Sequence, residues 1–121
     1  MIKIFKILFF LVFSFILING QAYSQENKIK IGLLIPLTGD NSKLGKQILN
    51  STRLAIKDIN SNQIEIYPKD TNSDPNKALQ SAIKLEQMGI NIVIGPVFYE
   101  NIIYLDEVKN ITFLSLTNKT L

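Results

Sequence analysis

The sequence predicts an α/β protein built on an open parallel sheet with right-handed crossovers. Two observations carry this prediction: four short apolar or alternating stretches are typical of strands, and stretches with helical spacing separate them in strict alternation. Connections long enough to hold a helix imply parallel neighbours rather than hairpins. The chain has 121 residues, which limits it to one small globular unit.

The first 24 residues are predicted to be a secretory signal peptide. Two lysines precede an apolar run over residues 7–18, and small residues stand at the third and first positions before a cut at Gln25. An uncleaved membrane anchor is the alternative, because residues 2–18 are nearly long enough to cross a bilayer. Cleavage would leave residues 25–121, which lack cysteine, as a protein of the bacterial periplasm.

The first half of the remaining chain predicts a strand, a helix and a strand. Residues 29–35 alternate and then become continuously apolar, as in a strand buried on both faces. A helix follows, with an apolar stripe made by Leu44, Ile48, Thr52, Ala55 and Ile59. Residues 64–67 alternate and stop at Pro68, which predicts a more exposed strand near an edge of the sheet.

The second half predicts a helix, a strand, a short helix and a strand. Asp74-Pro75 is a strong helix start, and Gly89 is a typical helix stop. The stripe expected to face the sheet consists of Ala78, Ala82, Leu85 and Met88. Residues 92–94 predict a short buried strand, and residues 111–116 a fourth strand. Between these two strands a short helical face is made by Ile102, Leu105 and Val108.

Composition excludes several kinds of chemistry. Cysteine and histidine are absent, so zinc sites on these residues, disulfides and Cys- or His-dependent nucleophiles are excluded. No glycine-rich phosphate loop follows the first strand, and Asp70 and Asp74 are explained by a turn and a helix cap. We expect no cofactor, no metal and no catalytic residue. The 13 basic and 10 acidic side chains give no support for a nucleic-acid surface.

The predicted sheet indicates where a ligand would bind. In open parallel sheets ligands bind outside the carboxyl ends of the strands, where loops leading into helices meet. Three segments occupy that edge here, residues 36–44, 96–100 and 116–118. We therefore expect any small-molecule function at these loops.

The order of elements and the turn residues resemble the start of a type I periplasmic solute-binding protein of the leucine/isoleucine/valine-binding class. The residues that carry the resemblance are 31–39, Leu44-Gly45, 55–60, Asp70 with Asp74-Pro75 and Ala78, and Gly89 with 92–96. The resemblance implies two α/β lobes that close on a ligand, with residues 25–121 forming an incomplete amino-terminal lobe. It also implies an exported, non-enzymatic receptor of an ABC-type uptake system for amino acids or other small molecules, with a membrane permease as partner.

The same resemblance implies which residues bind the ligand. They are Leu44, Phe98, Tyr99, Thr117 and Asn118. The class holds an amino-acid carboxylate at the positions that match Phe98 and Tyr99. Glu100 stands beside them and would repel such a carboxylate.

Two alternatives remain open at this stage. Residues 95–98 and 115–118 are also similar to the penicillin-binding-protein activators, exported relatives that act through a protein partner. That similarity implies a regulator of cell-wall synthesis whose partner is a penicillin-binding protein. The second alternative is a fragment without a function of its own, because half a cleft buries only part of a small ligand.

Overall fold

The computed structural model describes residues 1, 4, 6 and 27–117, so the predicted signal peptide lies almost entirely outside the described residues. Residues 27–117 contain a parallel sheet with the strand order β2-β1-β3-β4. The strands are β1 (Ile29–Ile35), β2 (Ile64–Asp70), β3 (Ile92–Ile94) and β4 (Thr112–Leu114). The helices are α2 (Ser42–Ile59) and α3 (Pro75–Gln87), and two 3-10 turns follow, η1 (Tyr99–Ile102) and η2 (Leu105–Glu107). The predicted fold class is confirmed.

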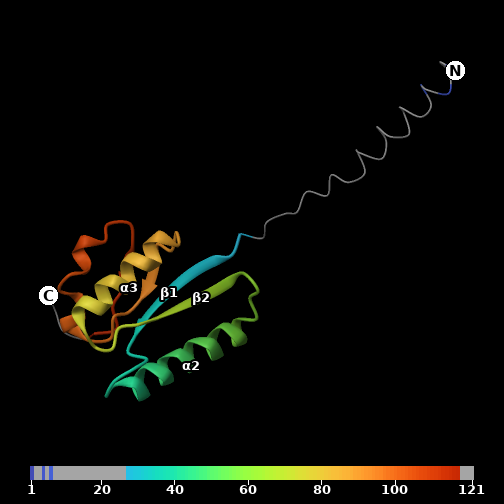
Figure 1. Cartoon of the computed structure of the whole chain (residues 1–121). Helices are drawn as coiled ribbons and strands as arrows, with labels where there is room; N and C mark the ends of the chain where they lie inside the picture. Colours follow the sequence, from blue (N-terminus) through green and yellow to red (C-terminus); the bar gives the residue numbers. More distant parts are fainter. Residues whose placement is uncertain (2–3, 5, 7–26, 118–121) are drawn as a thin grey trace.

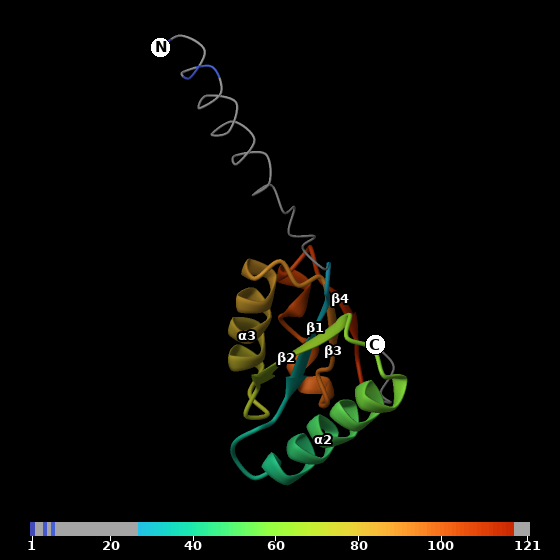
Figure 2. The ribbon, with the colours of Figure 1, turned by 90° about the vertical axis from the view of Figure 1, so that its right-hand side faces the viewer.

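The two helices lie on opposite faces of the sheet (Figures 1 and 2). β2 lies on one side of β1 and β3 on the other, so the chain reverses its direction across the sheet after β2. Crossovers of one hand then place α2 and α3 on different faces. Among the described residues, no helix combines the length and the apolar character that crossing a membrane requires.

The main cluster of buried core residues lies on the α3 face of the sheet. Its members are Leu34, Ala82, Leu85, Ile90, Val93, Leu105, Val108 and Ile111. Gly32 allows the close approach of α3, because a Cβ at this position would meet the side chains of Leu85 and Val93. The helix therefore rests on the sheet through small residues of both layers.

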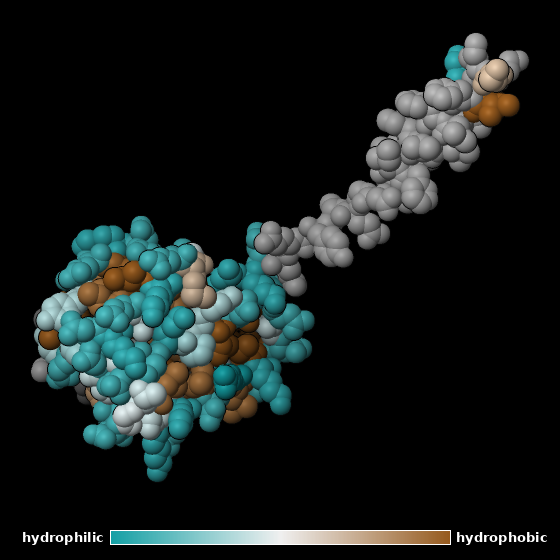
Figure 3. Space-filling model, in the orientation of Figure 1, coloured by the Kyte–Doolittle hydropathy of each residue, from teal (hydrophilic) through white to brown (hydrophobic). Residues whose placement is uncertain are grey.

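On the α2 face, Leu33 and Ile35 of β1 are completely buried, but α2 itself is little buried and its predicted stripe is partly wrong. The helix itself is confirmed, but Ala55 is exposed and Ile59 is 63% exposed. The half-buried residues of α2 are Ser42, Ile48, Leu49, Thr52 and Ile56, and Gly45 alone is buried. In the second half of the helix the packed stripe is thus rotated by one residue. Figure 3 shows hydrophobic residues exposed on the surface between β2 and α2.

The predictions for α3 are confirmed except at its end. The Asp74 carboxylate accepts a hydrogen bond from the Lys77 amide at 2.8 Å, and Pro75 is the first helical residue. Met88 was expected in the core but is 40% exposed, so this part of the prediction is wrong. Gly89 has a φ of +73° and turns the chain, so that Ile90 takes the core position instead.

The structure corrects the predicted end of β2. Pro68 does not stop the strand, which continues to Asp70 as an edge strand paired only with β1. The Thr71 amide donates to the carbonyl of Ile35, so alternate amides of β2 point to β1 and position 68 points outward. A proline there removes no hydrogen bond of the sheet.

The short helix predicted between the last two strands forms as 3-10 helix and not as α-helix. Its place is taken by η1 and η2, although Leu105 and Val108 are buried as expected. Apolar residues three apart share one side of a 3-10 turn, which has three residues per turn, so the spacing fits the observed form. β4 is also shorter than predicted, because Ile111 leaves the strand and joins the core.

Candidate functional site

The carboxyl edge of the sheet begins with the loop between β1 and α2. Pro36, at the start of this loop, is buried, and residues 38–41 are exposed. A Cβ at Gly45 would overlap the Pro36 carbonyl oxygen. Only glycine lets the first turn of α2 lie directly on the end of β1.

A carboxylate at the end of β2 holds this first loop in place. Asp70 Oδ1 accepts hydrogen bonds from the Leu37 amide at 2.7 Å, the Thr38 amide at 3.1 Å and the Asn72 amide at 2.9 Å. Asp70 Oδ2 accepts from Thr38 Oγ1 at 2.6 Å and pairs with Lys77 Nζ at 2.6 Å. Five donors from three segments thus surround one side chain.

These contacts control the ionisation of Asp70. Burial alone would raise the pKa of its carboxyl, but the hydrogen bonds from Lys77, Thr38 and the amides of Asn72 and Leu37 outweigh it and hold the pKa far below its usual range. The carboxylate is therefore charged at every physiological pH. Its charge serves the loop structure, since all its contacts are internal.

The loop between β2 and α3 is shaped to fit the first loop. Asn72 and Ser73 have φ values of +48° and +56°, and Asn41 Nδ2 donates to Ser73 Oγ at 3.0 Å. Gly39 has a φ of +76°, and a Cβ there would collide with the Asn72 side chain. The two loops form one rigid wall of the edge.

The loops after β3 and β4 are also tied together. The Gly95 amide donates to the Leu114 carbonyl at 2.9 Å, and the Leu116 amide donates to the Pro96 carbonyl at 3.0 Å. Ser115 Oγ makes a longer bond to the same Pro96 carbonyl, 3.4 Å. Residues that follow Pro96 and Leu116 therefore leave the sheet next to one another.

Three of the five predicted ligand residues lie on these two tied loops. Phe98 and Tyr99 are half-buried at the start of η1, and Thr117 is half-buried after β4. Leu44 lies in the first turn of α2 and is 39% exposed. Asn118 lies outside the described residues. The ligand role of these residues stays a prediction.

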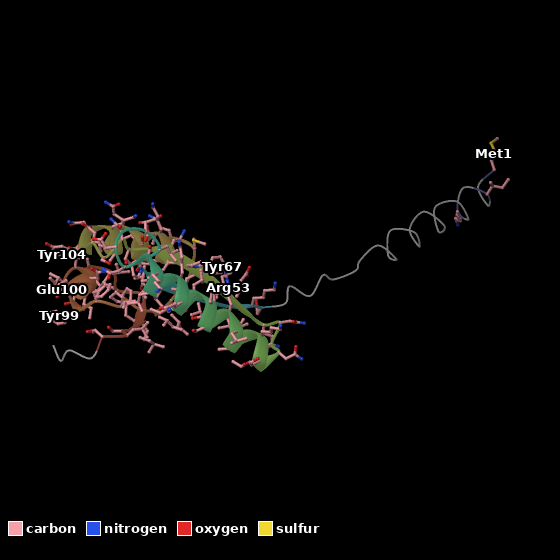
Figure 4. All side chains as sticks on the ribbon, turned by 90° about the horizontal axis from the view of Figure 1, so that it is seen from below. Met1, Arg53, Tyr67, Tyr99, Glu100 and Tyr104 are labelled. Atoms are coloured by element: carbon pink, nitrogen blue, oxygen red, sulfur yellow. The ribbon has the colours of Figure 1, made fainter. Side chains whose placement is uncertain are left out.

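The charged and aromatic side chains after β3 gather at one end of the molecule. Figure 4 shows Tyr99, Glu100 and Tyr104 there, away from Arg53 and Tyr67. Glu100 is exposed. Its carboxylate places negative charge beside Tyr99, as expected from the sequence.

Asn101 is a polar residue of this region that the sequence did not single out. Its side chain is completely buried, and neither its amide nitrogen nor its oxygen has a hydrogen-bond partner among the described residues. An unpaired buried amide costs about 1–3 kcal/mol. No pattern in a single sequence distinguishes it, because asparagine is abundant along the whole chain.

A pocket of about 380 Å³ lies elsewhere, at the amino ends of β1 and β3. Its lining residues are Lys28, Ile29, Lys30, Met88, Gly89, Asn91 and Ile92. In open parallel sheets ligands bind at the carboxyl ends of the strands, so this pocket carries no functional assignment. Within residues 27–117, no three acidic side chains come together as a metal site would require.

The parallel sheet, the reversal of strand order and the loops at its carboxyl edge define an open α/β binding fold. The chain belongs to the periplasmic binding protein family, whose profile matches residues 28–115. The fold is that of the type I members of this family, with leucine-binding proteins among the structural neighbours. The resemblance seen in the sequence is confirmed.

Three relatives illustrate the range of this family. A Leu/Ile/Val-binding protein homolog of Brucella abortus is 34% identical over 83 residues, which are 64% of this chain and 22% of that protein. An ABC-transporter solute-binding protein of Rhodopseudomonas palustris, in complex with 3,4-dihydroxybenzoic acid, is 29% identical with a TM-score of 0.59, covering 62% of this chain and 22% of that one. The C-domain of LpoA from Haemophilus influenzae, a regulator of PBP1A, is 26% identical with a TM-score of 0.63, covering 74% and 28%.

The chain spans about a quarter of the length of the curated relatives it matches. The relatives also differ in what their names state. The first is named a homolog of Leu/Ile/Val-binding proteins, the second is in complex with an aromatic acid, and the third is named a regulator of PBP1A. Membership of the family therefore leaves two functions to decide between.

Proposed function

We propose that the protein is the exported solute-binding component of an ABC-type uptake system, with branched-chain amino acids as the first solutes to test. In this proposal it is a receptor without enzymatic activity that delivers its solute to a membrane permease. Residues 1–24 are a leader removed on export to the periplasm. The family and the Leu/Ile/Val-binding relative support this choice.

The observation that carries the proposal is the tie between the loops after β3 and β4. The bonds from Leu116 and Ser115 to the Pro96 carbonyl put both loops at the edge where such sheets bind ligands. In our proposal Phe98 and Tyr99 cover the apolar part of the solute, and Thr117 and Asn118 donate hydrogen bonds to it. Leu44 contacts the solute from α2.

Calorimetric titration of the purified full protein tests this function. We expect saturable binding of leucine, isoleucine or valine, and Tyr99→Ala to weaken it at least tenfold. Tyr104→Ala is the matched control, because Tyr104 is an exposed tyrosine of the same region but not a predicted ligand residue. Absence of binding for all three amino acids, or equal effects of the two variants, would contradict the proposal.

A second candidate is a regulator that acts on a penicillin-binding protein. The exposed Glu100 favours it, since a carboxylate beside Tyr99 disfavours an amino-acid carboxylate and suits a protein surface instead. The similarity to the LpoA C-domain supports it as well. Capture of fluorescently penicillin-labelled proteins from detergent-solubilised membranes tests it, with Glu100→Lys as the variant expected to lose the capture.

A further inference from the structure

The contacts of Asp70 have the composition of an anion-binding site. Two consecutive backbone amides, Leu37 and Thr38, point at one carboxylate oxygen together with a third amide, that of Asn72. A hydroxyl and an ammonium group, from Thr38 and Lys77, hold the other oxygen. Convergent amides with a lysine are what proteins use to bind phosphate and carboxylate groups from solution.

Here the anion is part of the chain. Asp70 is the last residue of β2, whereas its donors lie after β1, after β2 and in the first turn of α3. The β1 loop of an open parallel sheet is where nucleotide-binding proteins receive an anionic ligand. In this protein the amides of that loop are already occupied.

We propose that Asp70 acts as an internal anion that fills an anion site built by the loops after β1 and β2, fixing the first loop and excluding a solute carboxylate from it. The proposal goes beyond the proposed function and does not depend on which solute is bound. Its consequence for specificity is that a ligand carboxylate has to be held outside the loops after β1 and β2. Without the Asp70 side chain, the same donors would accept a small carboxylate from solution.

Chemical rescue tests this proposal. Asp70→Ala removes one carboxylate and leaves room for formate, which has the size of the missing group. In the full protein labelled with 15N, we expect formate to shift the Leu37 and Thr38 amide resonances of Asp70→Ala saturably and to leave those of the unsubstituted protein unchanged. Sodium chloride at equal ionic strength and formamide, the neutral counterpart of formate, should have no such effect.

Thermal unfolding gives a second readout. At ten times its dissociation constant, formate should raise the unfolding midpoint of Asp70→Ala by roughly 6–11 °C more than chloride does, by mass action on a domain of this size. Asp74→Ala is the matched control, because the Asp74 side chain accepts a single amide, that of Lys77. We expect no formate-specific rise for that variant.

The formate experiment tests the proposal even if the Asp70→Ala variant folds poorly. If Asp70→Ala unfolds without formate, the recovery of folded protein should increase in formate and not in chloride. Equal recovery in the two salts, or equal shifts in the unsubstituted protein, would overturn the proposal. Asp70→Asn fills the space without the charge, so formate should not rescue it. Solute binding by the unsubstituted protein is a separate measurement, so failure of one proposal leaves the other intact.

Discussion

Gly45 lies so close to Pro36 that a Cβ on Gly45 would overlap the carbonyl oxygen of Pro36. The contact joins the first turn of α2 to the end of β1. Gly45 is the only fully buried residue of this helix, whereas Ile48, Leu49, Thr52 and Ile56 are half-buried. The approach of Gly45 to Pro36 is therefore the tightest contact between α2 and the end of β1.

This contact predicts whether replacing Gly45 by alanine stabilises or destabilises the protein. Alanine normally stabilises a helix relative to glycine by about 1 kcal/mol, but we expect Gly45→Ala to destabilise the protein by about 2 kcal/mol or more, because the backbone of Pro36 has to move. Urea unfolding measures the difference. Asn50→Ala, an exposed site on the same helix, should instead be neutral or slightly stabilising. A stabilised Gly45→Ala variant would show that the contact is not tight.

The ionisation of Asp70 predicts how stability depends on pH. Its pKa is lower in the folded than in the unfolded state, so its contribution is fully present above the unfolded pKa, near 4, and is lost as the pH falls toward the folded pKa. We expect Asp70→Asn to cost roughly 1–3 kcal/mol at pH 7. The difference between the two proteins should shrink steadily below pH 4 in urea unfolding. A difference that is constant from pH 7 to pH 3 would contradict the assigned charge state.

The centre and the edge of the sheet predict unequal effects of the same substitution. Leu34, on the central strand β1, is completely buried, whereas Leu114, on the edge strand β4, is 54% exposed. Leu34→Ala should cost about 2–5 kcal/mol because it leaves a cavity, and Leu114→Ala less than about 1 kcal/mol. Urea unfolding of both variants measures the contrast. Similar costs would mean that Leu114 on β4 is covered in solution.

The charge of Glu100 predicts a gain of affinity. If the solute carries a carboxylate, Glu100→Gln removes a repulsive charge beside Tyr99 and should strengthen binding severalfold at low salt, and less at high salt. Calorimetry with leucine, isoleucine or valine measures this change. Glu107→Gln, an exposed carboxylate of η2, is the control and should have no effect. A loss of binding in Glu100→Gln would instead indicate a solute with a positive charge near this position.

The fold was predictable because each element has a strong local signal. The alternation of 29–35, the Asp74-Pro75 cap and the stop at Gly89 all appear as expected. The errors fall where tertiary contacts decide. The side of α2 that carries Ile48, Leu49, Thr52 and Ile56 is set by how the helix lies on the sheet, and Pro68 is tolerated because β2 is an edge strand. Neither fact follows from the spacing of apolar residues.

The site was predictable only in part. The sequence placed the loops at one edge, and the structure ties the loops after β3 and β4 together. The role of Asp70 was missed, since its donors Leu37 and Thr38 lie more than thirty residues away along the chain. The sequence features that could have indicated this role are the Thr38-Gly39 turn after β1 and the position of Asp70 at the end of β2. The sequence did not indicate that Asn101 is buried, because the residue type alone does not tell a buried asparagine from an exposed one.

The strand order has a consequence for how the chain acquires its structure. β1 is made first, yet it pairs with β2 only after α2 has formed a crossover, and with β3 only after α3 has done the same. Parallel pairing across such long connections is slow compared with hairpin formation. The strand at the centre of the sheet is therefore the first to be synthesised and must wait for both crossovers before it gains its second neighbour.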